Sequence, residues 1–285
     1  LAQPYCSSQN TYAPRYYQRV AVNRTLDAIA RGQQRILLVM ATGTGKTYTA
    51  FQIVWRLLRS GIKKKVLYLA DRNILVDQTI SQDFAPLAKS VHKIQVAKEE
   101  RDTITSHEVY FSLYQQLVGD DDQEHYSELF RPDFFDLIIV DEAHKLGGST
   151  ESVARFKLGK GLSDAAPFLL LLSATPHQGK SDAFYRLMSL LDPLTFAEKM
   201  VISREKVAPF VIRTEKRKAI DEQGKPLFLP RITQLVPVRW EEQHTLQRQL
   251  YDQVTEYVKF GYNLAIREKR NYFGFLMLLL QRLIS

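Results

Sequence analysis

Five short blocks of almost uninterrupted apolar residues constrain the fold of this chain more than any other feature. They lie within RILLVMATGTGKT, KKVLYLADR, HEVYFSLYQQL, FFDLIIVDEAH and APFLLLLSATP, and none of them alternates regularly between apolar and polar positions. Such blocks are typical of parallel strands that are covered by helices on both faces. Helical patterns lie between them, as where Phe51, Val54, Trp55 and Leu58 recur at helical spacing before Gly61. The sequence therefore predicts an α/β domain around a parallel sheet.

The pattern changes after residue 195. Residues 196–240 are charged, contain several prolines and have no long periodic segment. An amphipathic helix follows in HTLQRQLYDQVTEYVKF, and the apolar segment 272–284 is predicted to be helical as well. We therefore expect residues 1–195 to form the α/β domain and residues 196–285 to form a largely helical extension.

Bulk properties narrow the choice of partners and compartment. The chain of 285 residues carries 39 Lys and Arg against 31 Asp and Glu, and this net charge of +8 favours polyanions such as nucleic acid. Cys6 is the single cysteine, so no internal disulfide can form, and a reducing compartment, the cytoplasm, is expected. No apolar run approaches the length needed to span a bilayer, and we expect no membrane partner.

The segment MATGTGKT, residues 40–47, joins the first apolar block to a helical pattern. Gly45, Lys46 and Thr47 match the end of the phosphate-loop pattern, whereas Met40 stands where that pattern has its first glycine. Phosphate binding depends on the second half of the loop, where backbone N–H groups at a helix N-terminus face the anion. Lys46 would reach the β- and γ-phosphates, and the Thr47 hydroxyl would ligate magnesium. A glycine turn with one exposed lysine is the alternative.

The segment IIVDEAH places two carboxylates directly after the fourth apolar block. A phosphate-loop fold holds its magnesium through a carboxylate at the end of a buried strand, which is the position of Asp141. Glu142 beside it could orient and deprotonate the attacking water. In isolation, such a pair would usually be a solvated strand end. Together with the phosphate loop, it predicts an enzyme that hydrolyses ATP in the presence of Mg²⁺.

The segments MATGTGKT, DEAH and SAT, in this order, resemble motifs one, two and three of helicase superfamily two. In that superfamily the first loop commonly begins with a residue other than glycine, so Met40 is compatible with a nucleotide site. The resemblance implies a RecA-like P-loop NTPase lobe with a nucleic-acid-dependent ATPase activity.

The resemblance also implies roles for individual residues. Residues implied to hold ATP lie upstream of the loop and within it: Gln18 at the adenine base, then Thr42, Gly43, Thr44, Gly45, Lys46 and Thr47. Asp141 and Thr47 would hold magnesium, and Glu142 would activate the water. His144 would couple the nucleotide site to Ser173 and Thr175. Arg72 and Gln78, in the segment LADRNILVDQ, would contact the backbone of DNA.

The chain resembles two groups of motors in different parts. Residues 12–142 resemble the motor subunit of type I restriction enzymes, and from Lys145 onwards LLLLSATPHQGKSDAFYRLMSLLDP and PFVIRTEKRKAIDEQGKPLFLPR resemble Swi/Snf-type bacterial translocases. Some translocases of that type belong to phage-defence systems, and both groups track along double-stranded DNA. The resemblance implies the first lobe of a longer DNA translocase, with a second RecA-like lobe and other restriction or defence subunits as partners. We expect this lobe alone to be nearly inactive, because the second lobe supplies arginines to the ATP site.

Several alternatives stay open at this point. A Swi/Snf-like ATPase that displaces proteins from nucleic acid and an RNA-dependent helicase would use the same motifs. A small-molecule kinase shares the phosphate loop but has no use for Gln18 or for SAT, and DNA stimulation of the ATPase would exclude it. A non-catalytic binding module is disfavoured by the intact Lys46, Asp141 and Glu142, and a phosphate-release assay would decide.

Overall fold

Two compact units make up the computed structural model of the chain, Leu1–Pro230 and Arg231–Ser285. The structure describes residues 3–7, 12–94, 106–117, 130–131, 133–148, 154–177, 179, 181–197, 202–215, 220, 223–226, 228, 232, 234, 241, 244–268 and 271–284. Among these residues, no helix combines the length and the apolar character that crossing a membrane requires.

A seven-stranded sheet runs through the described part of the first unit, in the order β3-β4-β2-β5-β6-β1-β7. Its strands are β1 (Arg35–Met40), β2 (Val66–Ala70), β3 (Val91–Lys93), β4 (Val109–Leu113), β5 (Leu137–Val140), β6 (Leu169–Ser173) and β7 (Val211–Thr214). Every pairing between them is parallel. The five apolar blocks form the five inner strands, as predicted. The sequence did not predict β3 and β7, because VHK and VIRT are short and lack a continuous apolar run.

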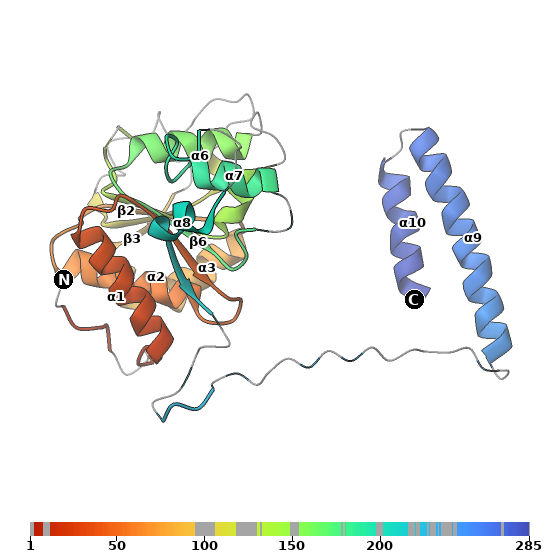
Figure 1. Cartoon of the computed structure of the whole chain (residues 1–285), viewed down its shortest axis with the longest axis horizontal. Helices are drawn as coiled ribbons and strands as arrows, with labels where there is room; N and C mark the ends of the chain where they lie inside the picture. The colour runs from red at the N-terminus through yellow and green to blue at the C-terminus, as the bar shows by residue number, and fades with distance from the viewer. Residues whose placement is uncertain are drawn as a thin grey trace. The chain divides into compact units, whose positions relative to one another are not determined.

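Helices cover both faces of the sheet (Figure 1). The described helices of this unit are α1 (Tyr16–Ala30), α2 (Lys46–Arg59), α3 (Asn73–Ser81), α4 (Tyr114–Leu117), α6 (Ala154–Ala165), α7 (Ser181–Ser189) and α8 (Arg204–Val207). Three 3₁₀ turns accompany them, η1 (Ala85–Ser90), η4 (Ala143–Gly147) and η5 (Ala208–Phe210). In β1, Leu37 and Val39 pack in the core beneath α6 and α7, while Ile36 and Leu38 pack beneath α1 and α2. Alternate residues thus enter opposite cores, which explains why the inner strands are apolar throughout.

The boundary between the units differs from the expected boundary after residue 195. Strand β7 pairs with β1 from Leu37 opposite Val211 to Met40 opposite Thr214, so the segment after residue 195 returns to the sheet. The first compact unit consequently extends to Pro230. The charged and proline-containing composition of 196–240 concealed this edge strand.

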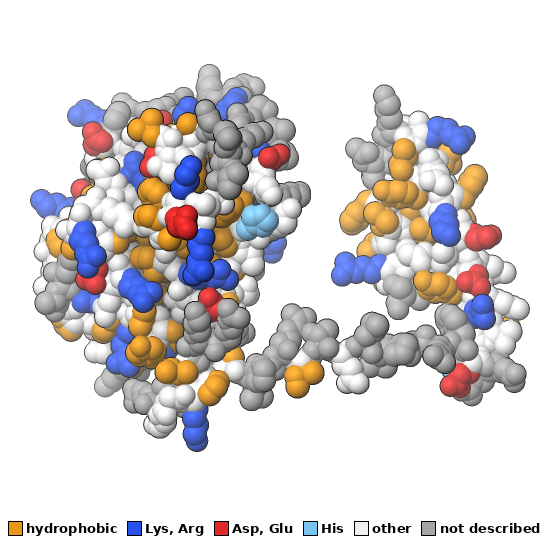
Figure 2. Space-filling view, viewed as in Figure 1, with side chains coloured by type: hydrophobic (Ala, Val, Ile, Leu, Met, Phe, Trp, Pro, Cys, Tyr) orange, Lys and Arg blue, Asp and Glu red, His pale blue; other side chains and the backbone are white. Residues whose placement is uncertain are grey.

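Two helices, α9 (Thr245–Arg267) and α10 (Asn271–Ile284), form the described part of the second unit, and both were predicted. They pack closely where Gly261 faces Met277, because a Cβ at Gly261 would lie 2.5 Å from the Met277 sulfur. The start of α9 is different, since Leu246 and Leu250 are exposed. Hydrophobic side chains are correspondingly visible on the surface of this unit (Figure 2). The shorter α10 packs against only part of the apolar stripe of α9.

Arg35, the first residue of β1, fastens the sheet to the end of α6. Its guanidinium donates to the carbonyl oxygens of Pro167 at 2.9 Å and Ala166 at 3.1 Å, and to the Ser163 hydroxyl at 3.1 Å. Burial lowers the pKa of Arg35, and the nearby Asp164 raises it. A cation at this place satisfies carbonyl groups that have no partner within the helix.

We expect Arg35→Met to lower the free energy of unfolding by about 2–3 kcal/mol, because it keeps the apolar stem but removes several charge-assisted hydrogen bonds. Urea denaturation measures the change. Arg24→Met, on the exposed face of α1, is the matched control and should stay within about 0.5 kcal/mol of the wild type. Equal stability of the two variants would show that Arg35 does not hold α6.

Candidate nucleotide site

The loop between β1 and α2 has the backbone of a phosphate cradle. Gly43 and Gly45 have φ angles of +77° and +76°, in the left-handed region that favours glycine. The Thr44 hydroxyl closes the turn between them by donating to the Ala41 carbonyl at 2.6 Å. Helix α2 begins directly afterwards, at Lys46, so its free N–H groups face the loop.

Met40 is a core residue rather than part of the cradle. It is the last residue of β1, is fully buried and packs in the core beneath α1 and α2. A glycine is therefore not required at this position, because the turn begins only after the strand has ended. Thr42, by contrast, is exposed in the turn.

Gln18 joins α1 to this loop. Its side-chain amide donates to the Thr44 carbonyl at 2.9 Å, and its oxygen accepts from the Arg15 backbone N–H at 2.9 Å. The side chain is nearly buried, and a Cβ placed on Gly45 would lie only 2.5 Å from the Gln18 nitrogen. The structure therefore brings the residue predicted for adenine recognition against the predicted phosphate loop.

Glu142, the second residue after β5, faces the same loop. The Lys46 Nζ atom lies 3.4 Å from Glu142 Oε1, so the loop and the DEAH segment form an ion pair. Glu142 has a φ angle of +48°, which is uncommon for a residue with a side chain. Its backbone N–H donates to Asp141 Oδ1 at 2.9 Å and helps to hold this turn. Such backbone strain tends to persist where a functional geometry requires it.

Asp141 is a largely buried carboxylate. Burial raises its pKa and the Glu142 charge raises it further, while the Glu142 N–H and Lys46 act in the opposite direction. A divalent cation would favour the charged form of this carboxylate. Carboxylate and hydroxyl oxygens suit Mg²⁺, which commonly takes few protein ligands and completes its shell with phosphates and water. Asp141 and Thr47 thus have the chemistry that a magnesium site needs.

His144, in η4, connects Glu142 with β6. Its Nδ1 atom lies 3.3 Å from Glu142 Oε2 and 3.3 Å from the Ser173 hydroxyl. Burial lowers the pKa of His144, the Glu142 charge raises it, and Lys145 and Lys46 lower it. The histidine predicted to couple the motifs therefore contacts Ser173. Thr175 has an exposed side chain, and the described contacts do not join it to His144.

Arg72 is the N-cap residue of α3, and Gln78 lies within this helix. Both side chains are exposed. Arg72 follows the end of β2, and its Nε atom is 3.7 Å from the Asp71 carboxylate. Asp71 also pairs with Lys145, which follows His144 in η4. The two residues predicted to contact DNA are thus accessible near the edge that carries the ATP motifs. In the basic run 213–218, residues 216–218 lie outside the described part.

Arg186 is a buried residue that the sequence did not single out. It lies in α7, only 4% exposed, and donates to the carbonyl oxygens of Gly147 and, at 2.9 Å, of Gly148. These contacts hold the end of η4 against α7. Gly147 permits the close approach, because a Cβ there would lie 2.3 Å from the Ala183 carbonyl oxygen. An arginine in an amphipathic helix would ordinarily be expected at the surface, so no sequence signal identified it.

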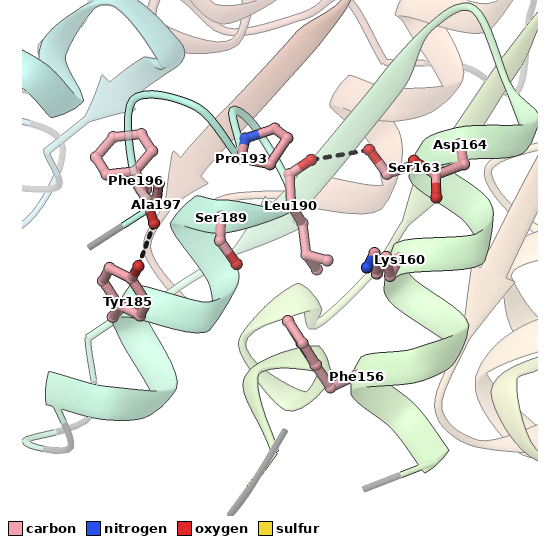
Figure 3. Close-up of a pocket in the computed structure, with 10 residues that line it drawn as sticks. All are labelled: Phe156, Lys160, Ser163, Asp164, Tyr185, Ser189, Leu190, Pro193, Phe196 and Ala197. Carbon is pink, nitrogen blue, oxygen red and sulfur yellow. Dashed lines mark hydrogen bonds between the residues drawn. The ribbon is translucent and has the colours of Figure 1, made fainter. Parts of the chain in front are cut away.

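A separate cavity of about 230 Å³ lies between α6, α7 and the turn that follows α7 (Figure 3). Its lining consists of Phe156, Lys160, Ser163, Asp164, Tyr185, Ser189, Leu190, Pro193, Phe196 and Ala197. The Ser163 and Tyr185 hydroxyls donate to the carbonyl oxygens of Leu190 and Phe196 in its wall. None of the residues predicted for ATP or DNA contributes to this cavity.

Two loop glycines allow a matched test of the cradle. Gly43→Ala adds only backbone strain, of the order of 1–2 kcal/mol, because no atom lies within 4 Å of its added Cβ. Gly45→Ala adds the same strain and displaces the Gln18 amide, so we expect the larger loss of thermal stability and of ATP-analogue affinity. Thermal unfolding and a fluorescence titration measure both. A greater loss for Gly43→Ala would contradict the described packing of Gln18.

Sequence comparisons agree with these motifs. Residues 11–178, more than half of the chain, match the family described as type III restriction enzyme, res subunit. The chain is 46% identical over 155 residues to the type I restriction enzyme EcoAI endonuclease subunit of Escherichia coli, over 54% of this chain and 19% of that protein. It is 30% identical over 179 residues to the RNA polymerase-associated protein RapA of Pseudomonas aeruginosa, over 60% of this chain and 18% of that protein. The chain thus spans less than a fifth of either relative.

Solved structures share the fold. One is the SWI2/SNF2 ATPase core of Sulfolobus solfataricus, which was solved in complex with double-stranded DNA. The match covers 99% of this chain and 60% of that chain, with a TM-score of 0.59 and 18% identity. Another is the Hef helicase domain of Pyrococcus furiosus. The match covers 95% of this chain and 58% of that chain, with a TM-score of 0.57 and 18% identity. The predicted RecA-like α/β fold is confirmed. The chain belongs to the family of the type III restriction enzyme res subunit.

Proposed function

We propose that this chain is the first RecA-like lobe of an ATP-driven motor that moves along double-stranded DNA in a restriction or defence system. The observation that carries the proposal is the ion pair between Lys46 of the phosphate loop and Glu142 of the DEAH segment, 3.4 Å apart. This pair connects the groups that would bind phosphate with those that would bind magnesium and water.

In this proposal the loop binds the triphosphate of ATP. The backbone N–H groups of Gly43 and Gly45 would point to the phosphates, and Lys46 would leave Glu142 to pair with the β- and γ-phosphates. Gln18, already fixed against Thr44, presents its amide to the adenine base. The Lys46–Glu142 ion pair is 3.4 Å long, and the Glu142 side chain is partly exposed. Because water screens an exposed pair, Lys46 can exchange it for a phosphate contact at a modest cost in free energy.

Hydrolysis would use the carboxylates after β5. Asp141 and Thr47 would hold magnesium, which would supply positive charge against the phosphate oxygens. Once Lys46 has turned to the phosphates, the Glu142 carboxylate is free to accept a proton from the attacking water. His144 contacts both Glu142 and Ser173. A change of Glu142 on nucleotide binding would therefore be coupled through His144 to the end of β6. A second lobe in the longer protein would add arginine contacts worth roughly 10³ to 10⁵ in rate, so this lobe alone should turn over very slowly.

DNA is the favoured track, with the second lobe and further subunits as partners in the longer protein. The net charge of +8 and the exposed Arg72 and Gln78 support backbone binding. The restriction-enzyme relative and the SWI2/SNF2 core solved with double-stranded DNA support the same choice. The likeness to RapA favours a second candidate, an ATPase that displaces proteins from nucleic acid. Displacement of a bound protein without a restriction phenotype would support that candidate.

Two substitutions in the full-length protein should separate binding from chemistry. Lys46→Ala removes the side-chain cation of the loop and should abolish most binding of a fluorescent ATP analogue. Glu142→Gln keeps the shape but cannot accept a proton, so binding should persist while turnover falls about 10²-fold or more. Glu205→Gln, an exposed carboxylate in α8, is the control and should change neither quantity. If Glu142→Gln kept its ATP turnover but lost binding of the ATP analogue, Glu142 would be a structural residue and not the general base.

DNA binding should depend on salt and hardly on sequence. Two unrelated duplexes should give parallel plots of log affinity against log salt. Arg72→Gln should weaken both equally and reduce the slope by roughly 1, as expected for the loss of one phosphate contact, whereas the exposed Arg24→Gln should not. A strong preference for one duplex would indicate base recognition, and tighter binding to RNA would reverse the choice of track.

A further inference from the structure

Tyr68 occupies a fixed place in the centre of β2. Its side chain is 1% exposed, and its ring stacks on Phe111 of β4 with the centroids 4.9 Å apart. Phe84 meets the same ring edge-on at 5.8 Å. Rings packed in this way leave the hydroxyl little freedom of position. Because phenylalanine would fill the same space, the hydroxyl itself needs an explanation.

The Tyr68 hydroxyl is buried and, within the described residues, makes no hydrogen bond of acceptable geometry. A buried hydroxyl without a partner costs about 1–3 kcal/mol. Asp141 lies beside Tyr68 in the sheet, because Tyr68 pairs with Ile139 of β5 and the Asp141 backbone N–H donates to the Leu69 carbonyl at 2.9 Å. In agreement with this placement, burial raises the pKa of Tyr68, Asp141 raises it further, and the Thr47 hydroxyl lowers it. These neighbours are the two residues proposed above to hold magnesium.

The three groups have complementary hydrogen-bonding capacities. A threonine hydroxyl that binds a cation through its oxygen must direct its proton elsewhere, and a carboxylate can only accept. A tyrosine hydroxyl can accept one proton and donate its own. Tyr68 comes from a strand that pairs directly with β5, the strand that ends at Asp141, so the sheet itself fixes this arrangement.

We propose that Tyr68 is a positioning residue for the magnesium ligands, an inference that rests on the nucleotide function proposed above. Its hydroxyl donates to the Asp141 carboxylate and accepts the proton of Thr47. The remaining lone pairs of the Thr47 oxygen and of the Asp141 carboxylate are thereby directed to the cation. Tyr68 itself does not touch the nucleotide.

The test compares nucleotide binding with and without magnesium in the full-length protein. A fluorescent ADP analogue is titrated in saturating Mg²⁺ and again in EDTA, and Mn²⁺ binding to the ADP complex is followed by electron paramagnetic resonance. Tyr68→Phe should reduce the affinity gained from Mg²⁺ about tenfold, as expected for losing a hydrogen bond to a charged group. Affinity in EDTA should stay within about twofold of the wild type, because the loop itself is unchanged.

Tyr110→Phe is the matched control. Tyr110 is equally buried in the neighbouring strand β4, but it packs on the opposite side of the sheet, and its hydroxyl accepts from the His107 N–H at 3.1 Å. It should retain the full effect of Mg²⁺. In a double-mutant cycle, Tyr68→Phe should add little to the loss caused by Asp141→Asn.

An unchanged effect of Mg²⁺ in Tyr68→Phe, or additive losses in the cycle, would overturn the inference while leaving the nucleotide site intact. A wild-type protein that binds no nucleotide would instead overturn the proposed function, and this inference with it.

Discussion

The parallel pairing of β2, β5, β6 and β1 determines where polar chemistry can occur in this molecule. All four strands run in one direction, so their carboxyl ends meet at one edge of the sheet. Helices bury both faces, so the strand interiors must be apolar. Polar side chains are therefore confined to the loops that follow the strands. The phosphate loop, Asp71, Asp141 and Ser173 share one edge for this reason.

Charge is arranged at this edge so that each ionic partner can be exchanged. Lys46 pairs with Glu142, and Glu142 is also in contact with His144, whose pKa is lowered by burial. Burial is the largest cause of the raised pKa of Asp141, which marks a carboxylate that a cation would stabilise. In our proposal, Lys46 would pair with the triphosphate and Asp141 would hold magnesium. Glu142 is then the carboxylate left for the water.

The sequence predicted the inner strands because these depend on local pattern, and local pattern also selected the candidate site residues, whose roles stay predictions. Continuous apolar blocks identify buried parallel strands, and glycines before Lys46 identify a left-handed turn. Strands β3 and β7 could not be predicted, since edge strands of three or four residues owe their form to pairing partners far along the chain. Arg186 and Tyr68 were missed for a related reason: their partners come from other elements, and only the fold brings them together.

The central claim is that the loop after β1 and the carboxylates after β5 form one ATP site. A crystal structure of the full-length protein with magnesium and a slowly hydrolysed ATP analogue tests it most directly. We expect Lys46 to contact the γ-phosphate instead of Glu142, and magnesium to lie between Thr47 and Asp141. A nucleotide bound elsewhere, or a Lys46–Glu142 pair that persists beside the bound triphosphate, would contradict it.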